Sequence, residues 1–485
     1  MYRVFTTYHE SKMQEICIIL YIALLFIVSN RKKTTSDIDF FTAGKNSSWP
    51  AVAFGMVGAT ISGISLISVP GMVVNSSFFY MQMVLGFILG YMAVAYVLLP
   101  IYYKLGSISI YSYLETRFGV KSRQTVSALF LINKMLSSAV KLYVVMLVLH
   151  LFIFEKYGVS FELATLIVVA VIFAYTFRNG VKSVVMTDCI QTACLIIVTV
   201  ILLVEAFSAV NGNLTDVFEF ASTQGISRIF DFDSFSNRTH FIKQFISGAF
   251  IVVVMTGLDQ DVMQKNLTCR NLKEAQKNMV VTGFMFTPVN LMLLVLGATL
   301  VYLANAQGLA MPEKSDEIVP FFCNQFGDVA ICCLTLGMIA ASFSSADSAL
   351  VGMTTCLLTD VMHKDLSKVS RIQRYAIHGV LALMLVLVIL LFNANAQTSA
   401  INIIYTIVSY VMAPILGMFM FGIFTKREIT DKATPFICMT TPFVMYYIDT
   451  LSAEYGYKFG YELLLLGAFV TILGLCLTTI GKSSK

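Results

Sequence analysis

The sequence is poor in charged residues, and this scarcity restricts the class of protein. Charged residues make up 13% of the 485 positions, whereas 57% are hydrophobic, and a soluble domain usually has about a quarter charged residues. The ten cysteines form no CxxC pair and the five histidines show no metal-ligand spacing, which argues against a disulfide framework or a structural zinc site. Together these features predict an all-α integral membrane protein.

Apolar runs follow one another along the whole chain, and each is long enough to cross a bilayer, which takes roughly 20 residues. They predict about 13 transmembrane helices, at 14–30, 49–72, 77–102, 125–152, 160–177, 183–209, 243–263, 279–305, 319–359, 374–393, 400–424, 433–451 and 460–481. The run at 319–359 is too long for one perpendicular crossing, so we expect its first part to approach along the interface. An odd number of helices places the termini on opposite sides.

Basic residues are distributed unequally between the two sets of connections. Of the 33 lysines and arginines, 23 fall on one side, including the loop from Lys265 to Lys277, and eight fall on the side of the N-terminus. The positive-inside rule therefore predicts a multi-pass protein of the plasma (inner) membrane with its N-terminus outside and its C-terminus cytoplasmic. The net charge of +5 reflects this topology better than it indicates nucleic-acid binding.

Four ionisable residues were identified inside predicted spans: Lys134, Lys141, Asp188 and Asp347. Such residues cost at least ~2.5 kcal/mol each at mid-bilayer and usually face the bundle interior or a cavity. For Lys134 a simpler role is snorkelling, in which the ammonium extends along the helix towards an interface. Lys141 needs a counter-ion, which either an internal carboxylate or an anionic substrate could supply.

Two polar stretches predict a cation site. The second span contains GMVGATISGISLISVPG, a glycine-rich and proline-containing stretch that predicts a broken helix whose carbonyls line a cavity. The ninth span contains ASFSSADSAL, in which Ala341, Ser344 and Ser345 share one helix face. With the carbonyls of Gly58 and Ile61, they would form a neutral shell of five oxygens that suits Na⁺. The alternative is that the hydroxyls bond their own helix and the glycines only allow close packing.

An ordered set of motifs resembles the sodium/solute symporter family, which contains sodium-coupled sugar, proline, choline and sialic acid carriers. The motifs are TISGISLISVPG, SIYSYLETRFGVKSR, YTFRNGVKSVVMTDCIQ, GLDQDVMQKNLTCRNLKEAQK and SSADSAL. The resemblance implies an inverted repeat of five plus five helices of the leucine-transporter type. Residues 1–45 would form a peripheral helix and first loop, 46–425 the transport core with repeats at 46–209 and 240–425, and 426–485 two further helices.

The resemblance also implies which residues bind ions and solute. It places the family's conserved sodium site on the same five residues derived above. Some relatives have a second sodium site, which maps onto Asp188, Ser344, Asp347 and Ser348; this site would hold sodium, a proton or only a structural hydrogen bond. The residues that the resemblance places at the substrate site are Thr60, Ser62, Ser65 and Gln82. Lys141 is a further candidate because of its charge, although the arginine of a sialic acid relative aligns with Ser137 and not with Lys141.

We therefore expect a sodium-coupled symporter that imports a small polar organic solute, such as a sugar, sialic acid or another carboxylate, by alternating access. The alternatives are a sensor or receptor on the same fold and a proton-coupled transporter. An enzyme is not expected, because the buried polar residues form no nucleophile, metal or acid–base set. The expected partners are Na⁺, the solute and lipid, with no nucleic acid, and the chain is expected to act as a monomer.

Overall fold

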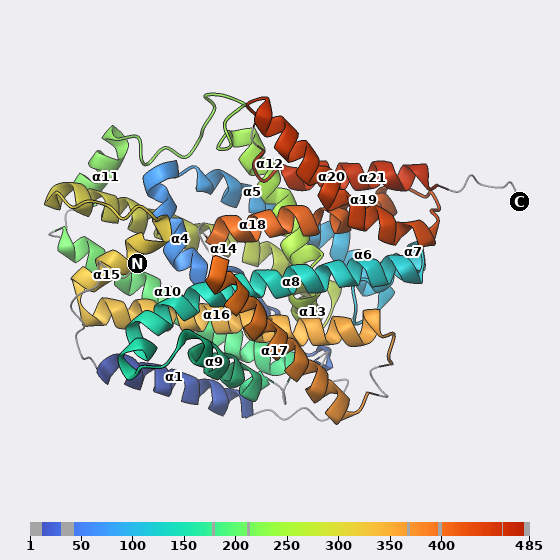
Figure 1. Cartoon of the computed structure of the whole chain (residues 1–485), viewed down its shortest axis with the longest axis horizontal. Helices are drawn as coiled ribbons and strands as arrows, with labels where there is room; N and C mark the ends of the chain where they lie inside the picture. The colour runs from blue at the N-terminus through green and yellow to red at the C-terminus, as the bar shows by residue number, and fades with distance from the viewer. Residues whose placement is uncertain are drawn as a thin grey trace, which may run out of the picture.

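The computed structural model is built from helices that pack side by side around a buried centre (Figure 1). It describes residues 12–30, 43–176, 180–210, 214–365, 369–395, 400–457 and 459–479. Within these ranges the chain has isolated bridges but no strand. Residues 31–42 and 177–179, which belong to connections predicted to be cytoplasmic, lie outside the described residues.

The helices of the first half of the chain are α1 (Lys12–Asn30), α3 (Trp49–Thr60), α4 (Gly63–Ser76), α5 (Tyr80–Ala93), α6 (Leu99–Leu105), α7 (Ser112–Arg117), α8 (Val120–Leu149), α9 (Phe161–Thr176), α10 (Gly180–Ala209) and α11 (Leu214–Thr223). Those of the second half are α12 (Phe241–Val252), α13 (Gln260–Asn266), α14 (Leu272–Gln307), α15 (Ile318–Phe326), α16 (Asp328–Cys356), α17 (Arg371–Asn395), α18 (Ala400–Val411), α19 (Ala413–Phe424), α20 (Thr434–Glu454) and α21 (Leu463–Leu477).

Each of the 13 predicted spans coincides with a helix or a bent pair of helices. Among the described residues, six helices are long and apolar enough to cross a membrane, or up to nine if each bent pair is one span, and three shorter apolar helices accompany them. The exact number of crossings therefore stays a prediction. The long run at 319–359 is divided at Gly327, whose φ of 99° separates α15 from α16.

Two of the three bent pairs begin the segments that the sequence predicts as repeats. The pair α3 and α4 is bent by 56°, and the pair of Phe241–Gly257 and α13 is bent by 72°. The third pair, Ile403–Val411 with α19, is bent by 44°. Backbone groups freed at such bends are tolerated at membrane depth only inside protein or beside a cavity, so the bends indicate where a site lies.

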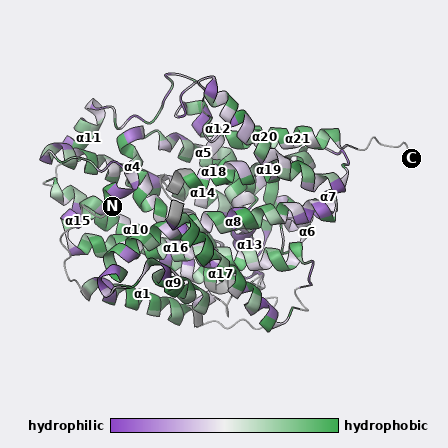
Figure 2. Ribbon diagram, viewed as in Figure 1, coloured by the Kyte–Doolittle hydropathy of each residue, from purple (hydrophilic) through white to green (hydrophobic). Residues whose placement is uncertain are grey.

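Among the described helices long enough to span a membrane, α16 is the most buried and α17 the least. In α16, 83% of the most apolar window is buried, compared with 33% in α17. The outer helix α17 exposes a stripe formed by Leu383, Leu387 and Leu391, which suits contact with lipid. Figure 2 shows the hydrophobic colour on most helices and much of the hydrophilic colour around α7 and α11. The helix α1 is peripheral and packs against α9, α10 and α16.

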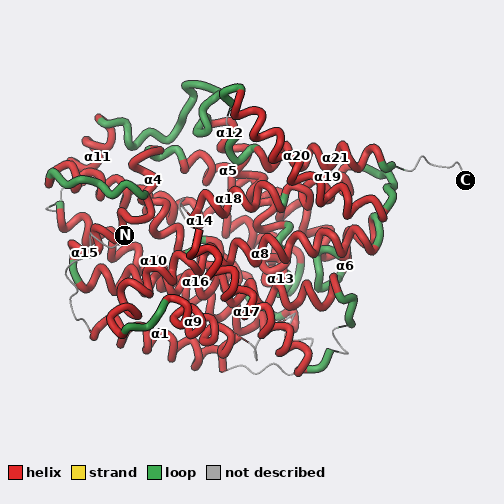
Figure 3. Tube along the Cα trace, in the orientation of Figure 1, coloured by secondary structure: helices red, strands yellow, loops and turns green. Residues whose placement is uncertain are grey.

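A long connection joins α11 to α12 at one end of the bundle, visible as the loop path at the top of Figure 3. Asp231 in this connection is buried, and its backbone carbonyl accepts a hydrogen bond from the backbone N–H of Phe241 at 2.7 Å. The connection is therefore held against the helix bundle.

Candidate sodium and solute sites

The break between α3 and α4 is held between two other helices, α10 and α16. Ile61 and Ser62 adopt extended backbone angles between the two helices. A Cβ on Gly58 would lie 2.1 Å from Oγ1 of Thr192 on α10, and a Cβ on Gly63 would lie 2.7 Å from Oγ of Ser342 on α16. Glycine is therefore required at both places for the neighbouring helices to approach the break.

The structure brings together the two segments that the sequence predicts to form the first sodium site. Gly58 and Ile61 lie at the break, and Ser345 of α16 donates a hydrogen bond from its hydroxyl to the Ala59 carbonyl at 3.3 Å. Ala341 and Ser344 are buried on the same helix. A small cation placed here would meet carbonyl and hydroxyl oxygens, the ligands that hard cations prefer.

The serines of α16 differ in the direction of their hydroxyls. The Ser348 hydroxyl donates to the Ser344 carbonyl at 2.6 Å, which is the ordinary bond of a serine to its own helix. The hydroxyls of Ser344 and Ser345 instead reach other helices, since Ser344 donates to Asp188 Oδ1 at 2.5 Å. The alternative that these hydroxyls only bond the carbonyls of their own helix therefore holds for Ser348 and not for Ser344 or Ser345.

The residues predicted to form a second cation site are separated into two groups. Asp188 accepts the Ser344 hydroxyl on one oxygen and forms an ion pair with Lys265 on the other, with 2.8 Å between Nζ and Oδ2. Asp347 accepts hydrogen bonds from the Tyr175 hydroxyl at 3.1 Å and from the Ser348 backbone N–H at 2.5 Å. The structure thus gives Asp188 a lysine partner that the sequence analysis did not anticipate.

The prediction that Lys265 belongs to a loop is wrong. The residue lies on α13, the short helix that follows the second break, and it is only 3% exposed. Asp259 caps this helix by accepting the backbone N–H groups of Asp261 and Val262. The bend of 72° turns α13 into the bundle, and this change of direction has no signal in hydropathy.

The prediction that Lys134 snorkels to an interface is also wrong. Its ammonium lies 2.9 Å from Asp259 and 2.6 Å from Asp261, and its side chain is 13% exposed. Lys134 therefore ties α8 to α13 inside the bundle. Asp259 and Asp261 are not among the ionisable residues predicted from the sequence, although both fall within the predicted seventh span, at 243–263, in the stretch DQD.

A small cavity of about 100 Å³ lies between the two broken helices and α8. Its polar lining includes Thr60, Ser65, Lys141, Ser345 and Ser348, three of which are predicted solute ligands. Its apolar lining includes an aromatic group formed by Tyr80, Phe87, Tyr91, Phe286 and Tyr405. The charged residues Lys134, Asp259 and Asp261 also line it. A small-molecule site usually combines apolar and aromatic side chains with placed polar groups, and in this cavity the polar groups are numerous.

The wall of this cavity on α8 offers unused polar groups. Among the described residues, Lys141 has no hydrogen bond or ion pair. On the same helix, the Ser137 hydroxyl and the side-chain amide oxygen of Asn133 are buried without a hydrogen-bond partner, and both residues line the cavity. Since buried polar groups are normally hydrogen-bonded, these groups are available to form hydrogen bonds with a polar ligand.

Two predicted solute ligands lie outside the cavity lining. The Gln82 side chain donates to the Thr239 carbonyl at 2.8 Å and accepts from the Asp231 backbone N–H at 3.0 Å. Its amide therefore fastens the connection between α11 and α12, and the prediction that Gln82 binds solute is wrong for this arrangement. Ser62 is buried at the break, where its carbonyl accepts the Ser65 backbone N–H, and does not line the cavity.

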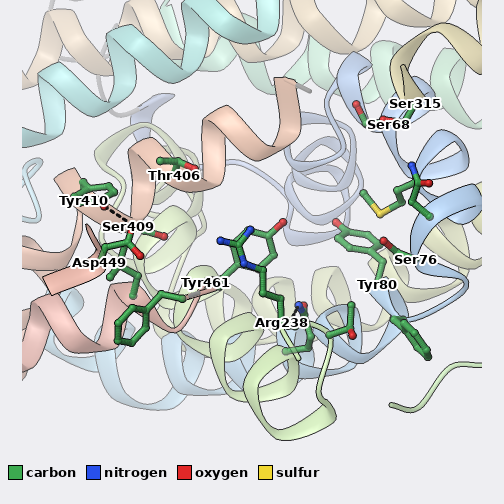
Figure 4. Close-up of a pocket in the computed structure, with 18 residues that line it drawn as sticks. Ser68, Ser76, Tyr80, Arg238, Ser315, Thr406, Ser409, Tyr410, Asp449 and Tyr461 are labelled. Atoms are coloured by element: carbon green, nitrogen blue, oxygen red, sulfur yellow. Dashed lines mark hydrogen bonds between the residues drawn. The ribbon is translucent and has the colours of Figure 1, made fainter. Parts of the chain in front are cut away.

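A larger cavity of about 540 Å³ lies next to the central one (Figure 4). Tyr80 lines both cavities, and its hydroxyl lies 3.3 Å from that of Tyr405, whose ring packs edge-on against Tyr461. Figure 4 also shows the hydrogen bond between Tyr410 and Asp449 on the wall of the larger cavity. The tyrosines therefore lie at the boundary between the outer vestibule, as we name the larger cavity, and the central cavity.

Comparison with known proteins identifies the family. The profile of the sodium:solute symporter family matches residues 40–434. The chain belongs to this family. It is a sodium-coupled membrane transporter and not an enzyme, and Na⁺ is its coupling ion, as the motifs indicated.

Individual relatives agree with this assignment. The chain is 25% identical to the sodium/sialic acid symporter NanT of Aliivibrio fischeri over 83% of this chain and 80% of that protein. It is 25% identical to the sodium/sialic acid symporter SiaT of Proteus mirabilis, over 90% and 88%. It is 27% identical to the mouse sodium-coupled monocarboxylate transporter 2, over 53% of this chain and 40% of that protein.

Solved structures share the fold. A substrate-bound, outward-open Na⁺-coupled sialic acid symporter superimposes with a TM-score of 0.79 and 21% identity, covering 96% of this chain and 98% of that one. The nucleobase-cation-symport-1 family transporter Mhp1 superimposes with a TM-score of 0.56 and 14% identity, over 90% and 93%. The predicted all-α fold with broken helices is thereby confirmed.

Proposed function

We propose that this symporter imports a small organic anion whose carboxylate binds Lys141 in the central cavity. The observation that carries the proposal is the unpaired ammonium of Lys141 beside the unpartnered Ser137 hydroxyl on one wall of that cavity. Lys141 is part-buried, and an ammonium with little water around it is stabilised by an anionic partner. The sialic acid and monocarboxylate relatives, whose named solutes carry a carboxylate, support this solute class.

The size of the cavity favours a short carboxylate. The volume of about 100 Å³ is below the roughly 300–1,000 Å³ of pockets that hold drug-sized ligands. A hydroxy acid or oxo acid of a few carbons fits this space, with its hydroxyl or carbonyl oxygen reaching Thr60 or Ser65. Its apolar end would contact the aromatic lining.

Sodium would bind where the break meets α16. The proposed ligands are the carbonyls of Gly58, Ile61 and Ala341 and the hydroxyls of Ser344 and Ser345. Ser345 also lines the central cavity, so the ion would lie next to the solute and hold the break in position. Binding of either one would then favour binding of the other.

The direction of transport follows from the proposed orientation in the plasma (inner) membrane. The N-terminus would be outside and the C-terminus cytoplasmic. The lining of the outer vestibule includes Arg238 and Thr239, which belong to a connection predicted to be outside. The vestibule would therefore open to the exterior. We propose that a monomer is the transporting unit.

The test is uptake into proteoliposomes under an inward sodium gradient. Unlabelled lactate, pyruvate, sialic acid, glucose and glycine would compete with a labelled carboxylate, and we expect inhibition by the carboxylates, strongest for the short ones. Lys141→Met removes a charge-assisted contact worth ~1.5–3 kcal/mol, which should raise the half-saturating solute concentration by about 10–100-fold. Lys141→Arg should retain part of the affinity.

The matched control is Lys104→Met, which neutralises an exposed lysine at the end of α6 and should leave uptake unchanged. Equal inhibition by glucose, or wild-type affinity in Lys141→Met, would show that the cavity does not select a carboxylate.

A further inference from the structure

The Lys265 ammonium lies in the bundle interior, where the sequence analysis expected a second cation. Its Nζ is 2.8 Å from Asp188 Oδ2 and 4.0 Å from Asp261 Oδ1, and the side chains of all three residues are at most 6% exposed. The other oxygen of Asp188 accepts the Ser344 hydroxyl. The ammonium therefore occupies the coordination sphere of the carboxylate on which a second sodium ion would depend.

The position of Lys265 is built into the fold. Asp259 caps the first turn of α13, and the bend before it turns the helix into the bundle. Asp261 packs closely against Gly352 of α16, since a Cβ there would lie 2.7 Å from the Asp261 Cβ. Lys265 follows one turn later on α13 and thereby faces Asp188 on α10.

Two monovalent cations cannot both occupy this position without strong repulsion. Lys265 and Na⁺ carry the same charge, and the site is buried, so solvent screens them little. Of the other acidic groups nearby, Asp261 pairs with Lys134, whereas Asp347 accepts hydrogen bonds only from the neutral Tyr175 hydroxyl and Ser348 N–H. A second sodium ion bound to Asp188 would therefore have to displace the Lys265 ammonium.

We propose that Lys265 is a covalently tethered counter-ion that replaces a second sodium ion, so that this transporter moves one sodium ion per solute. The inference deepens the proposed function, on whose sodium site it rests, by assigning its ion stoichiometry. If the solute is a monovalent carboxylate, the cycle moves no net charge. At zero voltage and a tenfold sodium gradient, the limiting accumulation is about tenfold for one ion and about 100-fold for two.

The experiment compares ²²Na⁺ and labelled solute fluxes in proteoliposomes. The wild type should take up one sodium ion per solute, with a Hill coefficient for sodium of about 1. Lys265→Ala exposes the Asp188 carboxylate and the Ser344 hydroxyl to a second ion, and should raise the ratio and the Hill coefficient towards 2. The double variant Lys265→Ala with Asp188→Ala removes the vacated site and should return to one ion.

A control variant and a second measurement, which requires no solute, test this proposal separately from the carboxylate proposal. Lys273→Ala changes an exposed lysine near the start of α14 and should behave as the wild type. Equilibrium ²²Na⁺ binding to the purified proteins requires no solute, so it gives the stoichiometry even if the carboxylate proposal fails or the variant does not transport. Two ions bound by the wild type, or one ion bound by Lys265→Ala, would overturn the proposal.

Discussion

Replacing Ser345 by alanine tests the sodium site most directly. The Ser345 side chain is only 7% exposed, and its hydroxyl makes a long hydrogen bond of 3.3 Å to the Ala59 carbonyl. A bond of this length contributes at most ~1 kcal/mol, whereas a contact from the same oxygen to a cation is worth ~1.5–3 kcal/mol. The difference of about 0.5–2 kcal/mol predicts that Ser345→Ala raises the half-saturating sodium concentration about 2–30-fold.

The assay is initial uptake at saturating solute while the external sodium concentration is varied. The maximal rate should change less than the sodium dependence, because the lost oxygen is one of about five around the ion. Ser342→Ala is the matched control, since it removes a buried hydroxyl that has no hydrogen-bond partner and lies outside the proposed ligand set. An unchanged sodium dependence in Ser345→Ala, or an equal shift in Ser342→Ala, would refute the site.

Three further predictions concern the helices around it. Gly58→Ala places a Cβ 2.1 Å from Oγ1 and 2.9 Å from Cα of Thr192, so it should destabilise the protein by ~1–3 kcal/mol and weaken sodium binding. Thermal unfolding with and without Na⁺ measures both effects, and wild-type stability would contradict the packing at Gly58. Tyr405→Phe removes the contact between the Tyr80 and Tyr405 hydroxyls and should speed labelling of a Ser137→Cys reporter from the vestibule by about 2–5-fold. An unchanged rate would argue that this contact is no barrier between the vestibule and the central cavity. A single cysteine at Arg270, which is exposed, should react with an impermeant thiol reagent only from the cytoplasmic side, and labelling in intact cells would reverse the proposed topology.

Much of the fold follows from features that are local in sequence. Apolar runs marked the long helices and the bent pairs, because burial in lipid requires about 20 consecutive apolar residues, but they did not mark the short helices α7 and α11. Glycines near the first break indicated it, because Gly58 and Gly63 allow α10 and α16 to approach more closely than any side chain would permit. The face of α16 that carries Ser344 and Ser345 was likewise readable from helical periodicity alone.

The ion pairs were not predictable in the same way. Lys265 counted as a basic residue of a loop, because hydropathy does not report that the chain bends by 72° after Gly257 and re-enters the bundle as α13. The pairing of Lys134 with Asp259 joins residues 125 positions apart, and that of Lys265 with Asp188 joins residues 77 apart. Such contacts depend on the packing of helices, which no local pattern records.

The location of Ser345 provides a physical basis for coupling between ion and solute. Its hydroxyl reaches the break at Ala59, and its side chain also lines the central cavity together with Thr60 and Ser65, which lie on opposite sides of the break. A sodium ion that joins the break to α16 would fix the angle between α3 and α4, and with it the spacing of those two hydroxyls. The solute would then bind a site that the ion has already ordered, and by thermodynamic reciprocity it would bind the ion more tightly in return. Because both effects arise from one break, a change that loosens the break should weaken both sodium and solute binding.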